Sequence, residues 1–105
     1  MTGRKGYVYQ QDEPAGILEE LEDNRYRFRY LQAYRGNPVS LSMPLKVRTH
    51  MFEGFPTVFE GLLPEGVQLE ALLSKLKIDR DDVFGQLLAV GEDTRGSLTI
   101  EELYH

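Results

Sequence analysis

The chain has 105 residues, of which 41% are hydrophobic and 28% charged, and its formal net charge is −5. This composition is typical of a globular domain and excludes a disordered chain, and no apolar run approaches the roughly 20 residues of a membrane span. The absence of cysteine excludes disulfides and thiolate metal sites. Because the first residues lack the apolar core of a signal peptide, we expect one cytoplasmic domain over residues 1–105 that binds no membrane.

The charge is distributed unevenly. Residues 1–50 contain 8 Lys/Arg and 6 Asp/Glu, whereas residues 51–105 contain 4 Lys/Arg and 11 Asp/Glu. A nucleic-acid binder normally shows a clustered basic surface, so we expect no direct contact with nucleic acid. The acidic half either favours a basic protein partner or simply keeps the chain soluble.

Alternation of apolar and polar residues with period two predicts strands in the first part of the chain. The predicted strands span residues 5–10, 15–21 and 25–30. The last of these alternates most cleanly, which places Tyr26, Phe28 and Tyr30 on the core face.

Arg25, Arg27 and Arg29 occupy the other face of that strand. One interpretation is a phosphate-binding row. We favour a solvated sheet face on which the arginines pair with acids such as Glu19 or Glu20, because no helix N-terminus or glycine-rich loop accompanies the row.

The middle of the chain gives weaker signals. Residues 39–43 alternate again before Pro44 ends the run, and residues 46–51 fit either an exposed strand or a loop. His50 lies in this segment, and His105 is the last residue. Two distant histidines without cysteine do not make a zinc site.

The second half is organised around residues 55–68. Apolar residues with the spacing of one helix face stand at 55, 58, 59, 62 and 63. Pro64 stops this helix and can open a second one, with Glu65 near its positive end. We call the resulting bend, residues 59–68, the kink.

Two further elements are predicted after the kink. Leucines with helical spacing stand at 69, 72, 73 and 76. Asp79 is expected to cap a third helix, with Ile78 and Val83 as a hydrophobic staple and Gly91 as its stop.

A loop at 92–96 then leads into a closing strand at 97–101. This order predicts an α+β fold: a mainly antiparallel sheet with two to three helices packed on one face and a C-terminal strand that returns to the sheet.

Few residues fit catalysis. The chain has no phosphate-binding glycine motif, and its serines lack a nucleophile signature. Glu60 and Glu65 could be imagined as the paired carboxylates of a hydrolase, but their neighbours favour a solvent-facing Glu60 and a cap-like Glu65. We therefore predict no catalytic, cofactor or metal site.

The kink is the stronger candidate site. Leu62, Leu63 and Val67 either form an exposed apolar surface with a polar rim, which is typical of a partner-binding site, or complete the core between two helices. The predicted partner-binding residues are Phe59, Leu62, Leu63, Pro64, Glu65, Gly66, Val67 and Gln68.

Six motifs follow one another along the chain: Gly16-x-Leu18, Tyr26-x-Phe28-x-Tyr30-Leu31, Pro38-Val39-Ser40-Leu41-Ser42-Met43-Pro44, Phe59-x-Gly61-Leu62-Leu63-Pro64-Glu65-Gly66, Val90-Gly91-x-Asp93-x-x-Gly96 and Leu98-Thr99-Ile100. In this order they resemble the N-terminal subdomain of HipA-type serine/threonine kinase toxins. HipA proteins continue into a kinase core, and this chain ends at His105 without one. We therefore expect no phosphotransfer activity of its own.

A free-standing copy of this subdomain resembles the HipS-like antitoxins of bacterial HipBST toxin–antitoxin systems. The resemblance implies binding and neutralisation of a separate HipA-like (HipT) kinase, with the DNA-binding protein HipB as a further partner, contacted directly or through the kinase. Two alternatives stay open: a non-inhibitory structural subunit that bridges kinase and HipB, and a small enzyme that uses Glu60 and Glu65.

Overall fold

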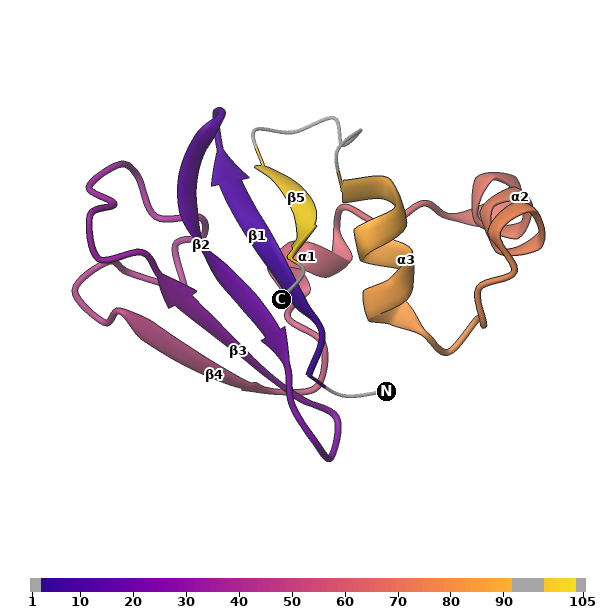
Figure 1. The fold of residues 1–105 in the computed structure, drawn as a ribbon, viewed down its shortest axis with the longest axis horizontal. Helices are drawn as coiled ribbons and strands as arrows, with labels where there is room; N and C mark the ends of the chain where they lie inside the picture. Colours follow the sequence, from indigo (N-terminus) through magenta and orange to yellow (C-terminus); the bar gives the residue numbers. More distant parts are fainter. Residues whose placement is uncertain (1–2, 92–97, 104–105) are drawn as a thin grey trace.

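The computed structural model describes residues 3–91 and 98–103, which form an α+β fold. The elements in chain order are β1 (Lys5–Gln10), β2 (Glu13–Glu20), β3 (Arg25–Tyr30), β4 (Thr49–Glu53), α1 (Thr57–Glu60), α2 (Gly66–Leu76), α3 (Val83–Val90) and β5 (Leu98–Leu103). Figure 1 shows the sheet at one end and α2 at the other, with α3 between them. The predicted fold class is confirmed.

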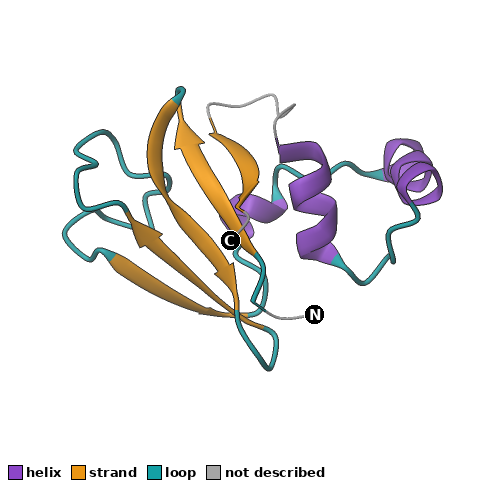
Figure 2. Cartoon of the chain, viewed as in Figure 1, coloured by secondary structure: helices purple, strands orange, loops and turns teal. Residues whose placement is uncertain are grey.

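Within the described residues, the strands form one antiparallel sheet in the order β4-β3-β2-β1-β5 (Figure 2). The closing strand returns to the sheet as predicted, because β5 pairs with β1. β2 begins earlier than expected. Its hairpin turn is only Gln11 and Asp12, whose φ angles of 50° and 68° are those of a two-residue turn that matches strand twist.

The core lies between one face of the sheet and the helices α1 and α3. Leu18 and Phe28 from the sheet, Phe59 from α1 and Leu87 from α3 are each fully buried. The Phe28 and Phe59 rings lie 5.9 Å apart between centroids. The alternation in β3 is confirmed, because Tyr26, Phe28 and Tyr30 all face this core.

Residues 39–43 do not form the strand that their alternation suggests. The Tyr30 hydroxyl accepts a hydrogen bond from the Val39 amide (3.0 Å) and donates one to the Met43 carbonyl (2.6 Å). These bonds hold the segment as a loop over the core, and Leu41 at its turn is 99% exposed. β4, at residues 49–53, takes the free edge of β3 instead.

Asp82, not Asp79, caps α3, so that prediction is wrong. Its carboxylate accepts a hydrogen bond from the Gly85 amide (3.1 Å) and two from the Arg4 guanidinium (2.7 and 3.2 Å). Arg4 also donates two hydrogen bonds to Glu20 on β2, each 2.8 Å long. This network ties the start of α3 to the sheet, which explains why the cap falls at Asp82.

Gly91 ends α3, but not in the left-handed conformation expected of a helix stop. Its φ is −59°, and a Cβ there would lie 2.3 Å from the Ile100 carbonyl oxygen. Glycine is required because α3 and β5 approach closely at this point. The loop predicted at 92–96 lies outside the described residues.

Candidate partner-binding surface

The kink forms much as its two-helix pattern predicts. α1 is a single turn, extended by hydrogen bonds from the Leu62 amide to the Phe59 carbonyl (3.0 Å) and from the Leu63 amide to the Glu60 carbonyl (3.1 Å). Pro64 ends this run. The second helix begins two residues after Pro64, at Gly66, with Glu65 as its N-cap.

The predicted site residues divide between core and surface. Phe59 is fully buried and supports the kink from beneath. Leu62 and Leu63 are half-buried and pack against the core, so they complete its edge. Val67 is 85% exposed and stands on the surface. Each of the two alternatives therefore describes part of the kink.

The polar members of the site rim this surface. Glu65, Gly66 and Gln68 are all exposed, and Pro64 is half-buried. Gly66 has a φ of +59°, and nothing lies within 4 Å of the position that its Cβ would take. Glycine is thus favoured there by backbone conformation rather than by crowding, and it sets the direction in which α2 leaves the bend.

α2 continues the surface, which the sequence pattern did not indicate. No residue of α2 is buried, although its leucines have the spacing of a helix face that packs against a core. Leu76 is 47% exposed, and Leu69, Leu72 and Leu73 are half-buried. In Figure 1, α2 lies beyond α3 on the side away from the sheet. Its apolar stripe is therefore only partly covered by this fold.

A side chain of α3 holds the segment that connects α2 to α3. Gln86, only 4% exposed, donates hydrogen bonds to the carbonyls of Asp79 (3.2 Å) and Arg80 (2.9 Å). Arg80 also forms an ion pair with Glu70 on α2 at 2.5 Å, but both side chains are more than half exposed. Such a pair contributes little stability. This ion pair therefore adds little to the position of α2.

The candidate catalytic residues do not form a cleft. Glu60 and Glu65 are both exposed, on α1 and at the start of α2. His50 lies in β4 with its ring edge-on to Tyr30, and its Nε2 is 3.2 Å from the Pro44 carbonyl oxygen. Over residues 3–91 and 98–103, no three His, Asp or Glu side chains are grouped to hold a metal.

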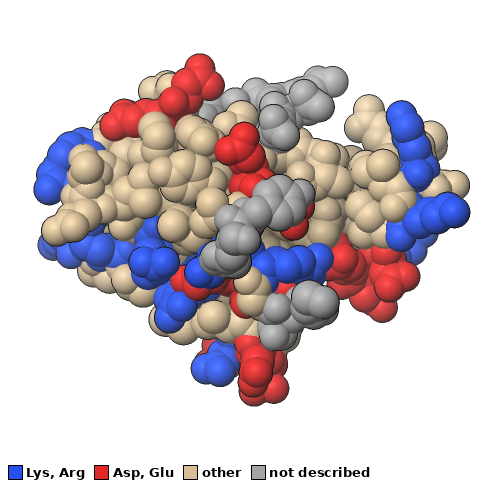
Figure 3. Space-filling view, in the orientation of Figure 1, with Lys and Arg blue, Asp and Glu red and all other residues tan. Residues whose placement is uncertain are grey.

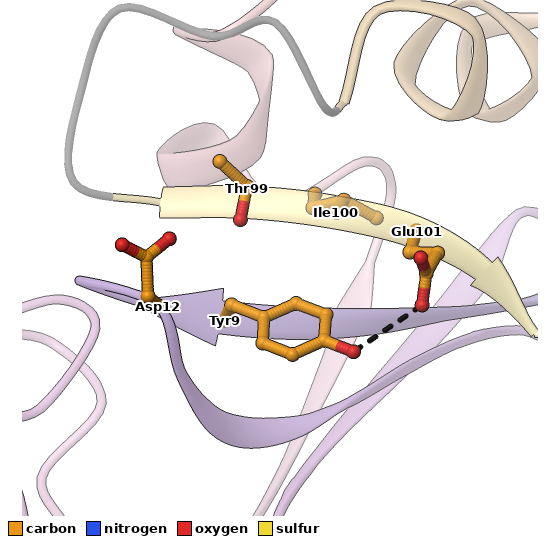
Figure 4. Close-up of a pocket in the computed structure, with 5 residues that line it drawn as sticks. All are labelled: Tyr9, Asp12, Thr99, Ile100 and Glu101. Carbon is orange, nitrogen blue, oxygen red and sulfur yellow. Dashed lines mark hydrogen bonds between the residues drawn. The ribbon is translucent and has the colours of Figure 1, made fainter.

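A shallow pocket lies elsewhere, between the end of β1 and β5 (Figure 4). Tyr9 and Glu101 lie along one side, and the Tyr9 hydroxyl donates a hydrogen bond of 3.2 Å to the Glu101 carboxylate. Asp12 and Thr99 lie at the other end. No residue that lines this pocket belongs to the predicted site.

None of the helices in the described part of the chain has the length and apolar character needed to cross a bilayer.

Comparison with known proteins agrees with this geometry. The family model of the HipA N-terminal domain matches residues 6–101. A Haemophilus influenzae protein described as uncharacterized is 34% identical over 100 residues, which are 94% of this chain and 92% of that protein. A solved structure described as the N-terminal domain of HipA toxin matches with a TM-score of 0.77 and 27% identity, covering 96% of this chain and 93% of that one.

The sheet with α1 and α3 on one face thus defines an α+β domain of the kind found at the N-terminus of HipA toxins. The chain belongs to the HipA N-terminal domain family. Its homology is to a non-catalytic domain.

Proposed function

We propose that this chain is a cytoplasmic antitoxin that binds a HipA-like (HipT) serine/threonine kinase and suppresses its activity. The observation that carries the proposal is an apolar surface on a HipA N-terminal domain that the domain's own core leaves uncovered. This surface consists of the exposed part of the kink and the apolar stripe of α2.

The composition of this surface fits a protein partner. Exposed apolar side chains with a polar rim mark interaction sites. Val67 is its most exposed apolar residue, and the neighbouring Glu65 and Gln68 are exposed as well. A specific interface buries about 800 Å² on each partner, which is more than one bend can supply. Continuity between the kink and the 11-residue helix α2 supplies a larger contact area.

The mechanism requires only differential binding. A domain that is covalently joined to a kinase in HipA has a surface complementary to that kinase. A separate copy of the domain can occupy the same position in trans. It inhibits if it binds an inactive conformation of the kinase more tightly than the active one.

Co-expression tests the proposal. The chain is produced together with the HipA-like kinase of the same genome, and growth is measured alongside recovery of the complex. Association with restored growth supports an antitoxin. Association with unchanged toxicity overturns neutralisation and supports a structural subunit, whose bridging role is then tested by adding HipB. A chain that does not associate with the kinase overturns the proposal.

A further inference from the structure

The sheet has a second face, opposite α1 and α3, which carries a convergent group of charges. Strand register places Lys5 on β1, Glu19 on β2, Arg27 on β3 and Met51 on β4 side by side across this face. The next row contains Glu101 on β5, Tyr7, Ile17, Arg29 and Thr49. We call the surface formed by Lys5, Tyr7, Ile17, Glu19, Arg27, Arg29 and Met51 the arginine face.

Glu19 is the centre of this face. It is only 6% exposed, although it lies on the side of the sheet away from the core. Its Oε1 accepts hydrogen bonds from Nε of Arg27 (2.9 Å) and Nε of Arg29 (3.3 Å), and Lys5 Nζ lies 3.6 Å from Oε2. Burial acts to raise the pKa of Glu19, but the bonds and charge of the two arginines outweigh it and leave that pKa below its ordinary value.

Around Glu19 itself positive charges outnumber negative ones, although Glu101 on β5 and Glu53 on β4 also lie on this face. Three cations share one carboxylate, within a chain whose net charge is −5. Both arginines use Nε to hold the same oxygen, so their terminal nitrogens are not engaged by Glu19. The side chains of Arg27 and Arg29 are 36% and 46% exposed. Two like charges held at one oxygen repel each other, and an incoming anion relieves this repulsion.

We propose that the arginine face binds an extended acidic segment of a partner protein. Arg27 and Arg29 are two residues apart on one strand, a spacing of about 6.7 Å. An extended peptide presents alternate side chains at the same spacing, so two carboxylates can each take one guanidinium through charge-assisted hydrogen bonds. Glu19 holds both arginines in position before the segment arrives.

The apolar members of the face favour a polypeptide over a nucleic acid. Ile17 lies beside Arg29 and Tyr7 lies beside Ile17 in the same row, and Met51, which is 55% exposed, lies beside Arg27. These side chains can contact the side-chain stems of a peptide. A polyphosphate chain instead needs a broad basic surface, whereas the second half of this chain is strongly acidic. Figure 3 shows basic side chains over the sheet end of the molecule and again around α2, with acidic ones interspersed.

An NMR titration of the labelled full chain tests the proposal. The probe is a peptide of alternating glutamate and threonine, compared with an alternating lysine–threonine peptide and a single-stranded oligothymidylate. The acidic peptide is expected to shift the amides of β2, β3 and β4, with an affinity that falls as salt rises. Failure of the acidic peptide to bind there, or tighter binding of the oligothymidylate, overturns the proposal.

Variants of opposite expected sign separate recognition from a structural role. Arg29→Gln, at a position where the side chain is nearly half exposed, is expected to weaken binding about tenfold, whereas Arg35→Gln in the following loop is the matched control and leaves it unchanged. Glu19→Gln keeps an acceptor oxygen that can hold the two arginines in position but removes the competing negative charge, so it is expected to tighten binding. If Glu19→Gln weakens binding as Arg29→Gln does, in a variant with unchanged amide dispersion, the face is structural and the proposal is overturned.

Discussion

The central sheet and α2 both carry regular apolar patterns, of period two and of helical spacing, but the structure buries them to different extents. Leu18 and Phe28 in the sheet are fully buried, and so is Leu87, where α3 packs on that sheet. α2 has four leucines at equally regular spacing and buries none of them completely. A periodic apolar stripe therefore predicts that a helix face will be covered, but not whether the chain itself or another protein covers it.

The largest expected effect comes from matched leucine truncations in the two regions. Leu87→Ala leaves a cavity under the sheet and is expected to cost about 2–5 kcal/mol of the free energy of unfolding. Leu76→Ala on α2 is expected to cost less than about 1 kcal/mol, because that side chain is already 47% exposed. Denaturant unfolding measures both. Equal losses would show that α2 belongs to the core and would remove the comparison.

A smaller loss is expected where α3 meets β5. In Gly91→Ala the new Cβ would lie 2.3 Å from the Ile100 carbonyl oxygen, so helix and strand must separate, at a cost of about 1–3 kcal/mol. Gly61→Ala is the control, because its φ is −64° and its Cβ would have no neighbour nearer than 3.9 Å. Thermal unfolding should rank the control at or slightly above the wild type. A tolerated Gly91→Ala would contradict the close approach.

The smallest stability effect concerns the α3 cap and depends on pH. Hydrogen bonding to Arg4 holds the pKa of Asp82 below its ordinary value of 3.8, despite partial burial, which acts in the opposite direction. The ionised carboxylate therefore stabilises the folded chain above that ordinary value. This stability is lost as the pH falls through the lowered pKa of the folded state.

Asp82→Ala is accordingly expected to cost about 0.5–2 kcal/mol at neutral pH, and this difference from the wild type should shrink in acid. Asp81→Ala, at an exposed neighbouring position, is the control and should change little. Urea unfolding over a pH series measures the difference. A pH-independent difference would show that the ionised carboxylate has no special role in capping.

Local pattern predicted most of the sheet, because alternation and turn residues determine strand pairing when one face is buried. The row in residues 25–30 gave the correct core face, and Glu19 is the arginine partner that was expected. Alternation was misleading at residues 39–43, where hydrogen bonds to the Tyr30 hydroxyl take the place of strand pairing. No local pattern contains those bonds.

The α3 cap and the kink were less predictable than the sheet, because both depend on contacts between residues far apart in the sequence. Three acids stand within four residues at 79–82, and only the contact from Arg4, 78 residues away in sequence, decides which one caps α3.

In the kink, the pattern left open whether the apolar residues face inward. Exposure separates them, with Phe59 in the core and Val67 at the surface. The surface continues along α2 because the rest of the fold does not fully cover the leucines of this helix. Sequence periodicity does not reveal how far a helix face is covered.

The affinity of the chain for the HipA-like kinase proposed as its partner, measured with Val67→Asp, tests the proposed function most directly. Leu41→Asp is the control, because it places the same charge on another exposed apolar residue, in a loop outside the kink and α2. With both variants folded as the wild type, Val67→Asp is expected to weaken binding at least about tenfold and Leu41→Asp to leave it unchanged. Wild-type affinity in Val67→Asp would show that the kinase does not bind at the kink.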